Sequence, residues 1–222
     1  MRMIRTASLM RPFLRPDRPP RAKGRATRRW SGVLAVASTV PPMRVVGGTA
    51  RGRRLVTPAG ANTRPTTDRV REAIMNALWS RGALDDATVL DLFAGSGALG
   101  IEALSRGAAH AVFVDDDPRA RQAIVQNLET CGLAGRAEVV AAKADRFLAR
   151  RAEESQFDLA FCDPPYAFDG WAGLLASFPA ALVVIESDRE IGLPDGWEML
   201  RSARYGTVWV GLAQRDGAGR GG

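Results

Sequence analysis

Histidine and cysteine are scarce in this sequence of 222 residues, which holds one histidine, His110, and two cysteines, Cys131 and Cys162. A single histidine argues against a zinc site built on several imidazoles and against a Ser-His-Asp triad, so we expect no bound metal. Two cysteines make no disulfide framework, which favours a reducing, cytoplasmic location. The sequence also lacks any run of eighteen apolar residues, so we expect neither a membrane span nor a membrane partner.

Acidic residues are almost missing from residues 1–42, where Asp17 is the single acid against ten Lys and Arg. The same stretch holds six of the thirteen prolines and no sustained periodicity, so we expect a disordered basic tail. Three explanations remain open: an upstream start with Met43 as the natural first residue, a basic arm that holds RNA, or an organellar transit peptide. We favour the upstream start.

Residues 43–82 are expected to form a small N-terminal β-hairpin and one helix. Segments 44–46 and 53–56 are strand-like and joined by a glycine-bearing connection, and apolar residues then recur with helical spacing from Val70 to Leu78. Over residues 44–71, seven arginines stand against Asp68 alone, which suits a polyanion. These are Arg44, Arg51, Arg53, Arg54, Arg64, Arg69 and Arg71.

From residue 83 to 213, apolar strand-like runs alternate with helical stretches, which predicts an α/β domain with a doubly wound, mostly parallel sheet. The expected strands are 89–93, 111–115, 137–141, 157–162 and 181–186, and the expected helices are about 98–106, 118–130, 144–153 and 170–177. No helix separates segments 197–201 and 205–213, so we expect an antiparallel C-terminal strand pair. We expect residues 214–222 to be a disordered tail.

A glycine-rich loop, Gly95-x-Gly97-x-x-Gly100, lies between the first expected strand of this domain and the first helix. Such glycines let the backbone turn tightly and approach a ligand. Asp115 ends the next strand, where a carboxylate can accept hydrogen bonds from ribose hydroxyls. The pattern fits a dinucleotide, S-adenosylmethionine (SAM), or glycines used only for packing. Asp91 favours SAM, because an acid before the turn can hold an ammonium group but would repel a pyrophosphate.

The strand 157–162 ends in Asp163-Pro164-Pro165-Tyr166. Two prolines stiffen the turn and remove two backbone donors, which leaves the Pro164 carbonyl oxygen available to a ligand. This oxygen and the Asp163 carboxylate could accept both N–H bonds of an exocyclic amine, while Tyr166 stacks on the base. The arrangement predicts methyl transfer from SAM to the amine of an unstacked nucleobase. A proline-stiffened loop without function is the alternative interpretation.

At these residues the sequence resembles the SAM-dependent amino-methyltransferases that carry a D/N/S-P-P-Y/F/W motif. Segments 47–53, 64–72 and 91–100 give a closer resemblance to the bacterial 16S rRNA (guanine-N2)-methyltransferase family, which modifies guanine 966, over about residues 43–213. The resemblance implies a Rossmann-like SAM-dependent methyltransferase domain. It also implies that the substrate is 16S rRNA, held in the 30S subunit or in a late assembly intermediate. Nothing in the sequence demands more than a monomer.

The resemblance also implies a role for individual residues. The methionine end of SAM would be held by Asp91, Gly95 and Gly97, and the ribose by Asp115, with Thr67 near this pocket. The guanine would be bound by Asp163, Pro164 and Tyr166. The RNA would be held by Arg51, Arg53, Arg54, Arg64 and Arg69. One departure is Lys143, which stands where the family has an Asp or Asn that contacts the adenine amine; a lysine cannot accept that hydrogen bond, so the adenine contact stays unassigned.

Three other functions remain open from the sequence. A DNA adenine-N6 methyltransferase would use the same Asp163-Pro164-Pro165-Tyr166 turn, although no separate DNA-recognition domain is evident. An NAD-dependent oxidoreductase would explain the glycines but not that turn. A non-catalytic RNA-binding module would explain the arginines but needs no SAM pocket.

Overall fold

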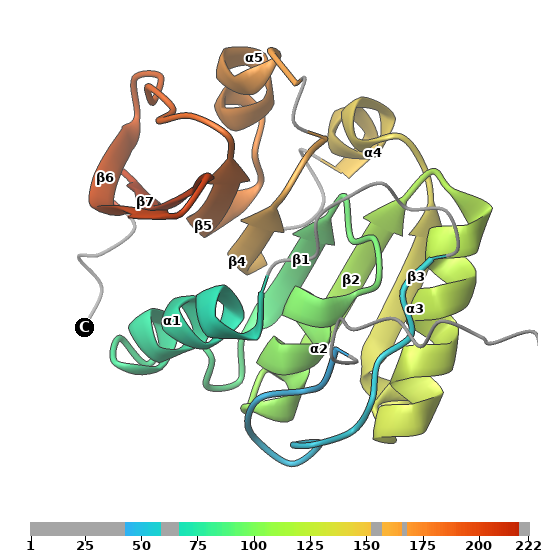
Figure 1. Ribbon diagram of the computed structural model, residues 1–222. Coiled ribbons are helices and arrows are strands. Elements are labelled where there is room, and N and C mark those ends of the chain that lie inside the picture. Colours follow the sequence, from blue (N-terminus) through green and yellow to red (C-terminus); the bar gives the residue numbers. More distant parts are fainter. Residues whose placement is uncertain (1–42, 59–66, 152–156, 166–167, 218–222) are drawn as a thin grey trace, which may run out of the picture. The chain divides into compact units, whose positions relative to one another are not determined.

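A seven-stranded sheet of order β3-β2-β1-β4-β5-β7-β6 runs through the protein (Figure 1). The computed structural model describes residues 43–58, 67–151, 157–165 and 168–217. The strands are β1 (Thr88–Leu92), β2 (His110–Asp115), β3 (Ala137–Ala141), β4 (Phe157–Cys162), β5 (Ala180–Ser187), β6 (Trp197–Tyr205) and β7 (Val208–Arg215). Strands β1 to β5 pair in parallel, and β7 is antiparallel to both β5 and β6. This confirms the doubly wound, mostly parallel sheet, in which the strand order reverses between β1 and β4.

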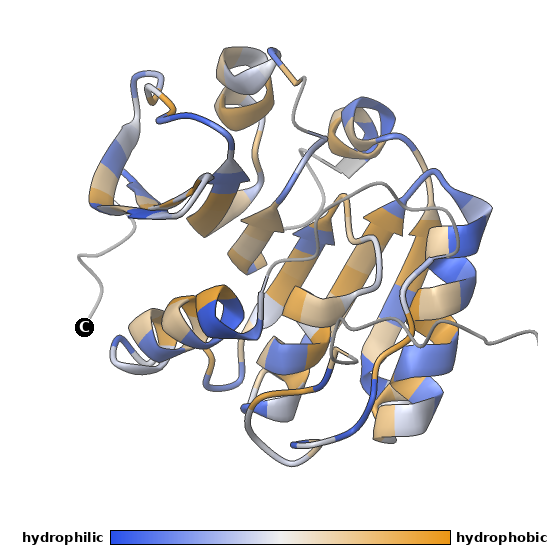
Figure 2. Ribbon diagram, viewed as in Figure 1, coloured by the Kyte–Doolittle hydropathy of each residue, from blue (hydrophilic) through white to orange (hydrophobic). Residues whose placement is uncertain are grey.

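Helices cover both faces of this sheet. One face carries α1 (Asp68–Trp79), α2 (Ala98–Ser105) and α3 (Pro118–Cys131), and the other carries α4 (Ala144–Arg151) and α5 (Trp171–Ala176); a single 3-10 turn, η1 (Ala134–Arg136), precedes β3. Successive strand residues serve opposite faces: Val89 joins the core beneath α2, and Leu90 joins the core beneath α4. The central strands β1, β2 and β4 are accordingly largely apolar, whereas α3 is apolar on one side and polar on the other (Figure 2). Among the described residues no helix has the length and apolar character needed to cross a bilayer.

Local sequence signals set the ends of the helices. The side chain of Thr67 accepts a hydrogen bond from the Val70 amide and caps α1. Asp117 caps α3, and Pro118 occupies its first turn. Gly132 ends α3 in the left-handed conformation, with a φ of 70°.

The C-terminal strand pair is confirmed, but its strands are longer than expected. Tyr205 belongs to β6 rather than to the second strand, and Gly206 lies in the turn between β6 and β7. Strand β7 continues to Arg215, because it is the inner strand and pairs on both sides: Gln214 faces Leu182 of β5 and Glu198 of β6.

The predicted N-terminal β-hairpin is not formed. Residues 43–58, which we call the N-terminal arm, contain one isolated antiparallel bridge, between Arg44 and Arg54, and no strand. Hydrogen bonds from the Val45 amide to the Arg53 carbonyl and from the Gly52 amide to the Val45 carbonyl close the turn locally. The arm is therefore a loop with a short, bridged base.

Other backbone groups of the arm bond to helix α2. The amides of Val46 and Gly47 donate to the buried carboxylate of Glu102. The Ala50 amide donates to the hydroxyl oxygen of Ser105, which in turn donates to the Gly47 carbonyl at 2.6 Å. A loop whose polar groups are satisfied by a neighbouring helix does not need a strand partner, which explains why the hairpin is absent.

Candidate active site

Three carboxylates gather where strands β1, β2 and β4 end. Asp91 and Asp115 lie near the carboxyl ends of β1 and β2, and Asp163 directly follows β4. We call them the acid trio. Asp91 is 3% exposed, Asp115 is half-buried and Asp163 is open to solvent. The parallel register brings these residues to one edge of the sheet, at the point where the strand order reverses and ligands of such sheets bind.

The pKa values of two members of the trio are raised. Burial raises the pKa of Asp91 to about 8, and the charges of Asp163 and Asp115 add to the effect, while a hydrogen bond from the Gly100 amide opposes it. Water reaches Asp163, yet the protein around its carboxyl group still raises the pKa to about 6 by desolvation. The ligand-free site therefore holds a proton on Asp91 at neutral pH and favours a cationic ligand over an anionic one.

The neighbouring thiol does not act as a nucleophile. Cys162 is buried at the end of β4, and desolvation, together with the charges of Asp163 and Asp91, raises its pKa well above the ordinary value of a thiol. It packs in the core beneath α4 and α5. Any group transfer at this edge therefore proceeds without a cysteine intermediate.

Two members of the acid trio organise the glycine loop between β1 and α2. The Gly95 amide donates to Asp115 at 2.8 Å, and the Gly100 amide donates to Asp91 at 2.9 Å. The loop is thus tied to the ends of β1 and β2 before any ligand arrives. Such preorganisation lowers the entropy cost of binding.

The three positions of the loop require glycine for different structural reasons. A Cβ at Gly100 would lie 2.4 Å from the ring of Phe113, and a Cβ at Gly97 would lie 3.2 Å from Ile124. Both glycines therefore allow helix α2 to pack closely, and Gly97 also has a φ of 75°. At Gly95 a Cβ would meet only the Phe93 carbonyl oxygen, at 4.0 Å. Of the three, Gly95 is the one whose Cβ direction faces open space.

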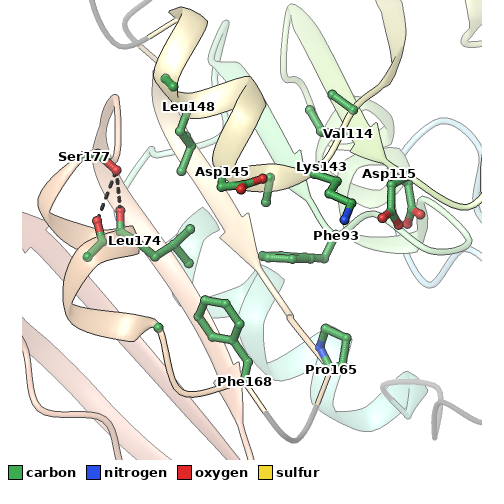
Figure 3. Close-up of a pocket in the computed structure, with 16 residues that line it drawn as sticks. Phe93, Val114, Asp115, Lys143, Asp145, Leu148, Pro165, Phe168, Leu174 and Ser177 are labelled. Atoms are coloured by element: carbon green, nitrogen blue, oxygen red, sulfur yellow. Dashed lines mark hydrogen bonds between the residues drawn. The ribbon is translucent and has the colours of Figure 1, made fainter.

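A cavity of about 650 Å³ opens beside the acid trio, between the ends of β1 and β2 and the helices α4 and α5 (Figure 3). Its apolar walls include the rings of Phe93 and Phe168, which meet edge to face with centroids 5.9 Å apart. Its charged lining consists of Asp115, Asp116, Lys143 and Asp145. An enclosure of this size with aromatic walls and a few polar groups is typical of a small-molecule site.

Sequence reasoning missed the two aromatic walls of this cavity. Phe93 directly follows β1 and has a φ of 64°, a left-handed conformation that a bulky residue rarely adopts. Phe168 lies beyond the proline turn, and its backbone amide donates to the Pro165 carbonyl. The position of Phe93 at the carboxyl end of the central strand was the available signal, since ligands bind along that edge.

The structure places the other predicted site residues as follows. Pro165 lines the cavity, whereas Pro164 is buried beneath it in the turn. Thr67 caps α1 and is not among the residues that line the cavity. Two further predicted residues, Tyr166 and Arg64, lie outside the described part of the chain.

The structure does not bring the arginines of the N-terminal arm to the acid trio. Arg51, Arg53 and Arg54 are exposed, but the arm is bonded to Ser105, the last residue of α2, whereas the glycine loop precedes the first. Helix α2 has eight residues and is about 12 Å long. Arg51 therefore lies near the opposite end of this helix from the loop. Beyond Arg54 the arm returns toward the loop, because Val56 bonds Asn127, which also donates to the carbonyl of Ser96. Arg69 is exposed in the first turn of α1.

Arg71, a further member of the predicted basic cluster, is buried rather than available to a polyanion. Its Nη2 atom lies 2.7 Å from the carboxylate of Asp68 and 2.7 Å from the carbonyl oxygen of Arg44. Its Nε atom lies 3.8 Å from Glu102, which is also fully buried. This arginine therefore joins α1, α2 and the N-terminal arm.

The fold and the site together define the class of protein to which this chain belongs. The parallel sheet with an antiparallel C-terminal pair, the glycine loop after β1 and the proline turn after β4 are those of a Rossmann-like methyltransferase fold. The chain belongs to the family described as Conserved hypothetical protein 95, whose profile matches residues 43–214.

Named relatives and solved structures agree with this family. The chain is 39% identical over 192 residues to Ribosomal RNA small subunit methyltransferase D of Escherichia coli (strain K12), covering 80% of this chain and 92% of the relative. It is 41% identical over 186 residues to the protein YlbH of Bacillus subtilis (strain 168), covering 79% of this chain and all of the relative. The solved structure of yhhF from Escherichia coli superposes with a TM-score of 0.69 and 38% identity, covering 79% of this chain and 98% of that one.

Proposed function

We propose that this protein transfers a methyl group from SAM to the exocyclic N2 of a guanine in 16S rRNA. The observation that carries the proposal is the acid trio beside an aromatic-walled cavity, which Asp115 of the trio and Pro165 of the proline turn line. Family membership supports it, because relatives that match most of the chain are named as small-subunit rRNA methyltransferases. The 30S subunit or a late assembly intermediate is the proposed substrate, and a cytoplasmic monomer the proposed state.

The cavity fits the methyl donor. Phe93 and Phe168 offer flat apolar faces for an adenine, and Asp115 can accept hydrogen bonds from ribose hydroxyls while it holds the Gly95 amide. Asp91 is placed to pair with an ammonium group, and such a pairing lowers the pKa that burial has raised. Lys143 lines the same cavity and can only donate, so it faces an acceptor atom of the ligand.

Charge also separates this ligand from a dinucleotide. A pyrophosphate bound at the glycine loop would lie against three carboxylates, two of which already repel ionisation of Asp91. SAM instead carries two positive groups, a sulfonium and an ammonium. The acid trio therefore disfavours the NAD-dependent oxidoreductase that the glycine pattern alone allowed.

SAM supplies an activated methyl group on its sulfonium; the chain supplies position. The Asp163 carboxylate and the Pro164 carbonyl are proposed to accept the two N–H bonds of the target amine, which directs the nitrogen lone pair at the methyl carbon. The new N–C bond forms as the C–S bond breaks, leaving a neutral thioether. The amine then loses one proton, and the ionised Asp163 is the nearest proposed acceptor. Two ordered acceptors aimed at a developing charge are a recognised source of rate.

The turn itself does not choose between guanine and the DNA adenine of the alternative methyltransferase. An acceptor pair serves either amine, so the choice of rRNA guanine rests on the relatives named for ribosomal RNA. Mass-spectrometric mapping of modified nucleosides in 16S rRNA, from cells with and without the gene, tests it. We expect one N2-methylguanine to disappear from the deletion strain; an unchanged rRNA profile contradicts the proposal.

Asp163→Ala tests the chemistry within the site. We expect SAM affinity to remain within a few-fold of wild type and single-turnover methyl transfer to fall by at least about 100-fold, as for other positioned electrostatic groups. We expect the wild-type rate to rise near pH 6, where Asp163 ionises. Asp163→Asn keeps one acceptor oxygen but does not titrate, so this rise should be absent in the variant. Asp195→Ala, at an exposed turn before β6, is the matched control. A wild-type rate in Asp163→Ala excludes the acceptor-pair mechanism.

A further inference from the structure

A second recess borders the cofactor cavity and is strongly basic. It measures about 550 Å³ and lies between the first turn of α3, the end of β3 and helix α4. Its charged lining consists of four cations and one acid: Arg121, Lys143, Arg146, Arg150 and Asp116. Lys143 and Asp116 also line the cofactor cavity, so the two spaces are contiguous. We call this the α3–α4 recess.

The cations of the recess differ in their surroundings: one is hydrogen-bonded to the end of β2, and the other three are exposed. The Nη1 atom of Arg121 donates to the carbonyl oxygen of Asp115 at 3.0 Å, which fixes this guanidinium group at the end of β2, beside the acid trio. Arg146 and Arg150 are exposed and follow one another at a spacing of four residues on α4, so both point along one helix face. Lys143 is exposed as well.

The sheet geometry gives the distance from the recess to the reacting base. Strand β3 is the third neighbour of β4 in the order β3-β2-β1-β4, and adjacent strands lie 4.7–4.9 Å apart. The end of β3 is therefore about 14 Å from the end of β4, on the same edge of the sheet. A strand whose base lies beside Asp163 would have to span this distance to place a flanking phosphate in the recess.

We propose that the α3–α4 recess binds phosphate groups of the RNA strand that flanks the target base. Guanidinium groups bind phosphate oxygens through charge-assisted, often paired hydrogen bonds. The three guanidinium groups of the recess and the ammonium group of Lys143 outnumber its single acid. The recess lies beside the end of β3, on the same edge of the sheet as the acid trio. Phosphate contacts there would fix the register of the strand over the site. The proposal rests on the proposed function, since it names where that substrate is held.

A double substitution, Arg146→Gln with Arg150→Gln, tests the recess without touching the cofactor cavity. The probe is an unmethylated 16S rRNA fragment carrying the target guanine, and binding is measured by fluorescence anisotropy over a salt series. We expect weaker binding and a log–log salt slope that is smaller by roughly 1.4 to 1.8 units, at 0.7 to 0.9 for each lost phosphate contact. SAM affinity, measured by calorimetry, should be unchanged. Arg81→Gln with Arg201→Gln, two exposed arginines outside the recess, removes the same charge and should leave the slope intact.

The outcomes separate the two proposals. A wild-type salt slope in the Arg146/Arg150 variant overturns the proposal that the recess binds phosphate groups. An equal decrease of the slope in the control variant also overturns it, because it would indicate a general effect of net charge. If the slope falls only in the Arg146/Arg150 variant but wild-type protein leaves guanine N2 unmethylated, the recess stands and the proposed function fails. Competition by inorganic phosphate at low millimolar concentration as strong as that by RNA would assign the recess to a free anion instead.

Discussion

Asp91 is ionisable, fully enclosed and placed at the end of the central strand. Its pKa of about 8 means that the folded protein keeps a proton there which the unfolded chain, with a pKa near 3.8, releases. Between these two pH values the folded state binds more protons than the unfolded state, so the free energy of unfolding falls as pH rises. The residue contributes most to stability below pH 3.8 and least above pH 8.

Asp91→Asn removes this titration and is expected to stabilise the ligand-free protein at high pH. Between the two pKa values, the wild type loses about 1.4 kcal/mol of unfolding free energy for each pH unit, and the variant avoids this loss. An asparagine can still accept the Gly100 hydrogen bond, so the loop should survive. Thermal unfolding from pH 4 to 9 measures the effect: the melting temperature of the variant should rise above that of wild type as pH increases.

The same substitution should weaken SAM binding, because an amide cannot pair with an ammonium group as a carboxylate does. Asp195→Asn, at an exposed turn, is the control for both measurements. Parallel melting curves for wild type and Asp91→Asn across the pH range would show that Asp91 is ionised in the folded protein, contrary to its burial.

The N-terminal arm is held by helices α2 and α3. Glu102, fully buried on α2, accepts hydrogen bonds from the arm amides of Val46 and Gly47 and faces the guanidinium groups of Arg71 and Arg106. Asn127 of α3 adds a second anchor, since its side chain bonds Val56 in both directions and also donates to the carbonyl of Ser96 in the glycine loop. The arm is therefore part of the folded domain.

Glu102→Ala is expected to destabilise the protein by roughly 3–5 kcal/mol, because it leaves buried positive charge and two amides without this carboxylate. Increased protease cleavage within residues 43–58 should accompany the loss. Glu129→Ala, on the exposed side of α3, should change the unfolding free energy by less than about 0.5 kcal/mol. Denaturant unfolding and limited proteolysis provide the measurements. Equal stability of the two variants would mean that the arm docks through other contacts.

The secondary-structure elements and the residues of the N-terminal arm differ in how well the sequence predicts them. Strands β1, β2, β4 and β5 could be predicted because each is a short apolar run that is largely buried, and the acids at the ends of β1, β2 and β4 followed from that. Strand β3, at the sheet edge, is only partly buried and was found from its place in the alternation of strands and helices. The arm could not, because its partners Glu102 and Ser105 come more than fifty residues later and no local pattern specifies them. Burial of Arg71 was hidden for the same reason: its charge predicts exposure, and only the fold supplies Glu102.

The family profile matches residues 43–214. We therefore expect a chain of residues 43–222 to fold and to methylate the same guanine as the full chain. Removing the ten basic residues of 1–42 should weaken RNA binding at low salt only, because such contacts are non-specific and screened. Single-turnover rates and salt-dependent binding of the two chains make the comparison. A shortened chain that folds but loses methyl transfer would place an essential RNA contact before Met43.

The proposed pairing of Asp91 with the ammonium group of SAM predicts that binding of the methyl donor releases a proton. At neutral pH, Asp91 must give up its proton before it can pair with an ammonium group, and that proton passes to the buffer. The measured binding enthalpy then contains the heat of buffer protonation, so titrations in Tris and in phosphate should differ although the affinity at one pH does not. The same coupling makes the affinity itself rise with pH up to about 8. The methyl donor and the proton thus compete for one carboxyl group at the centre of the sheet.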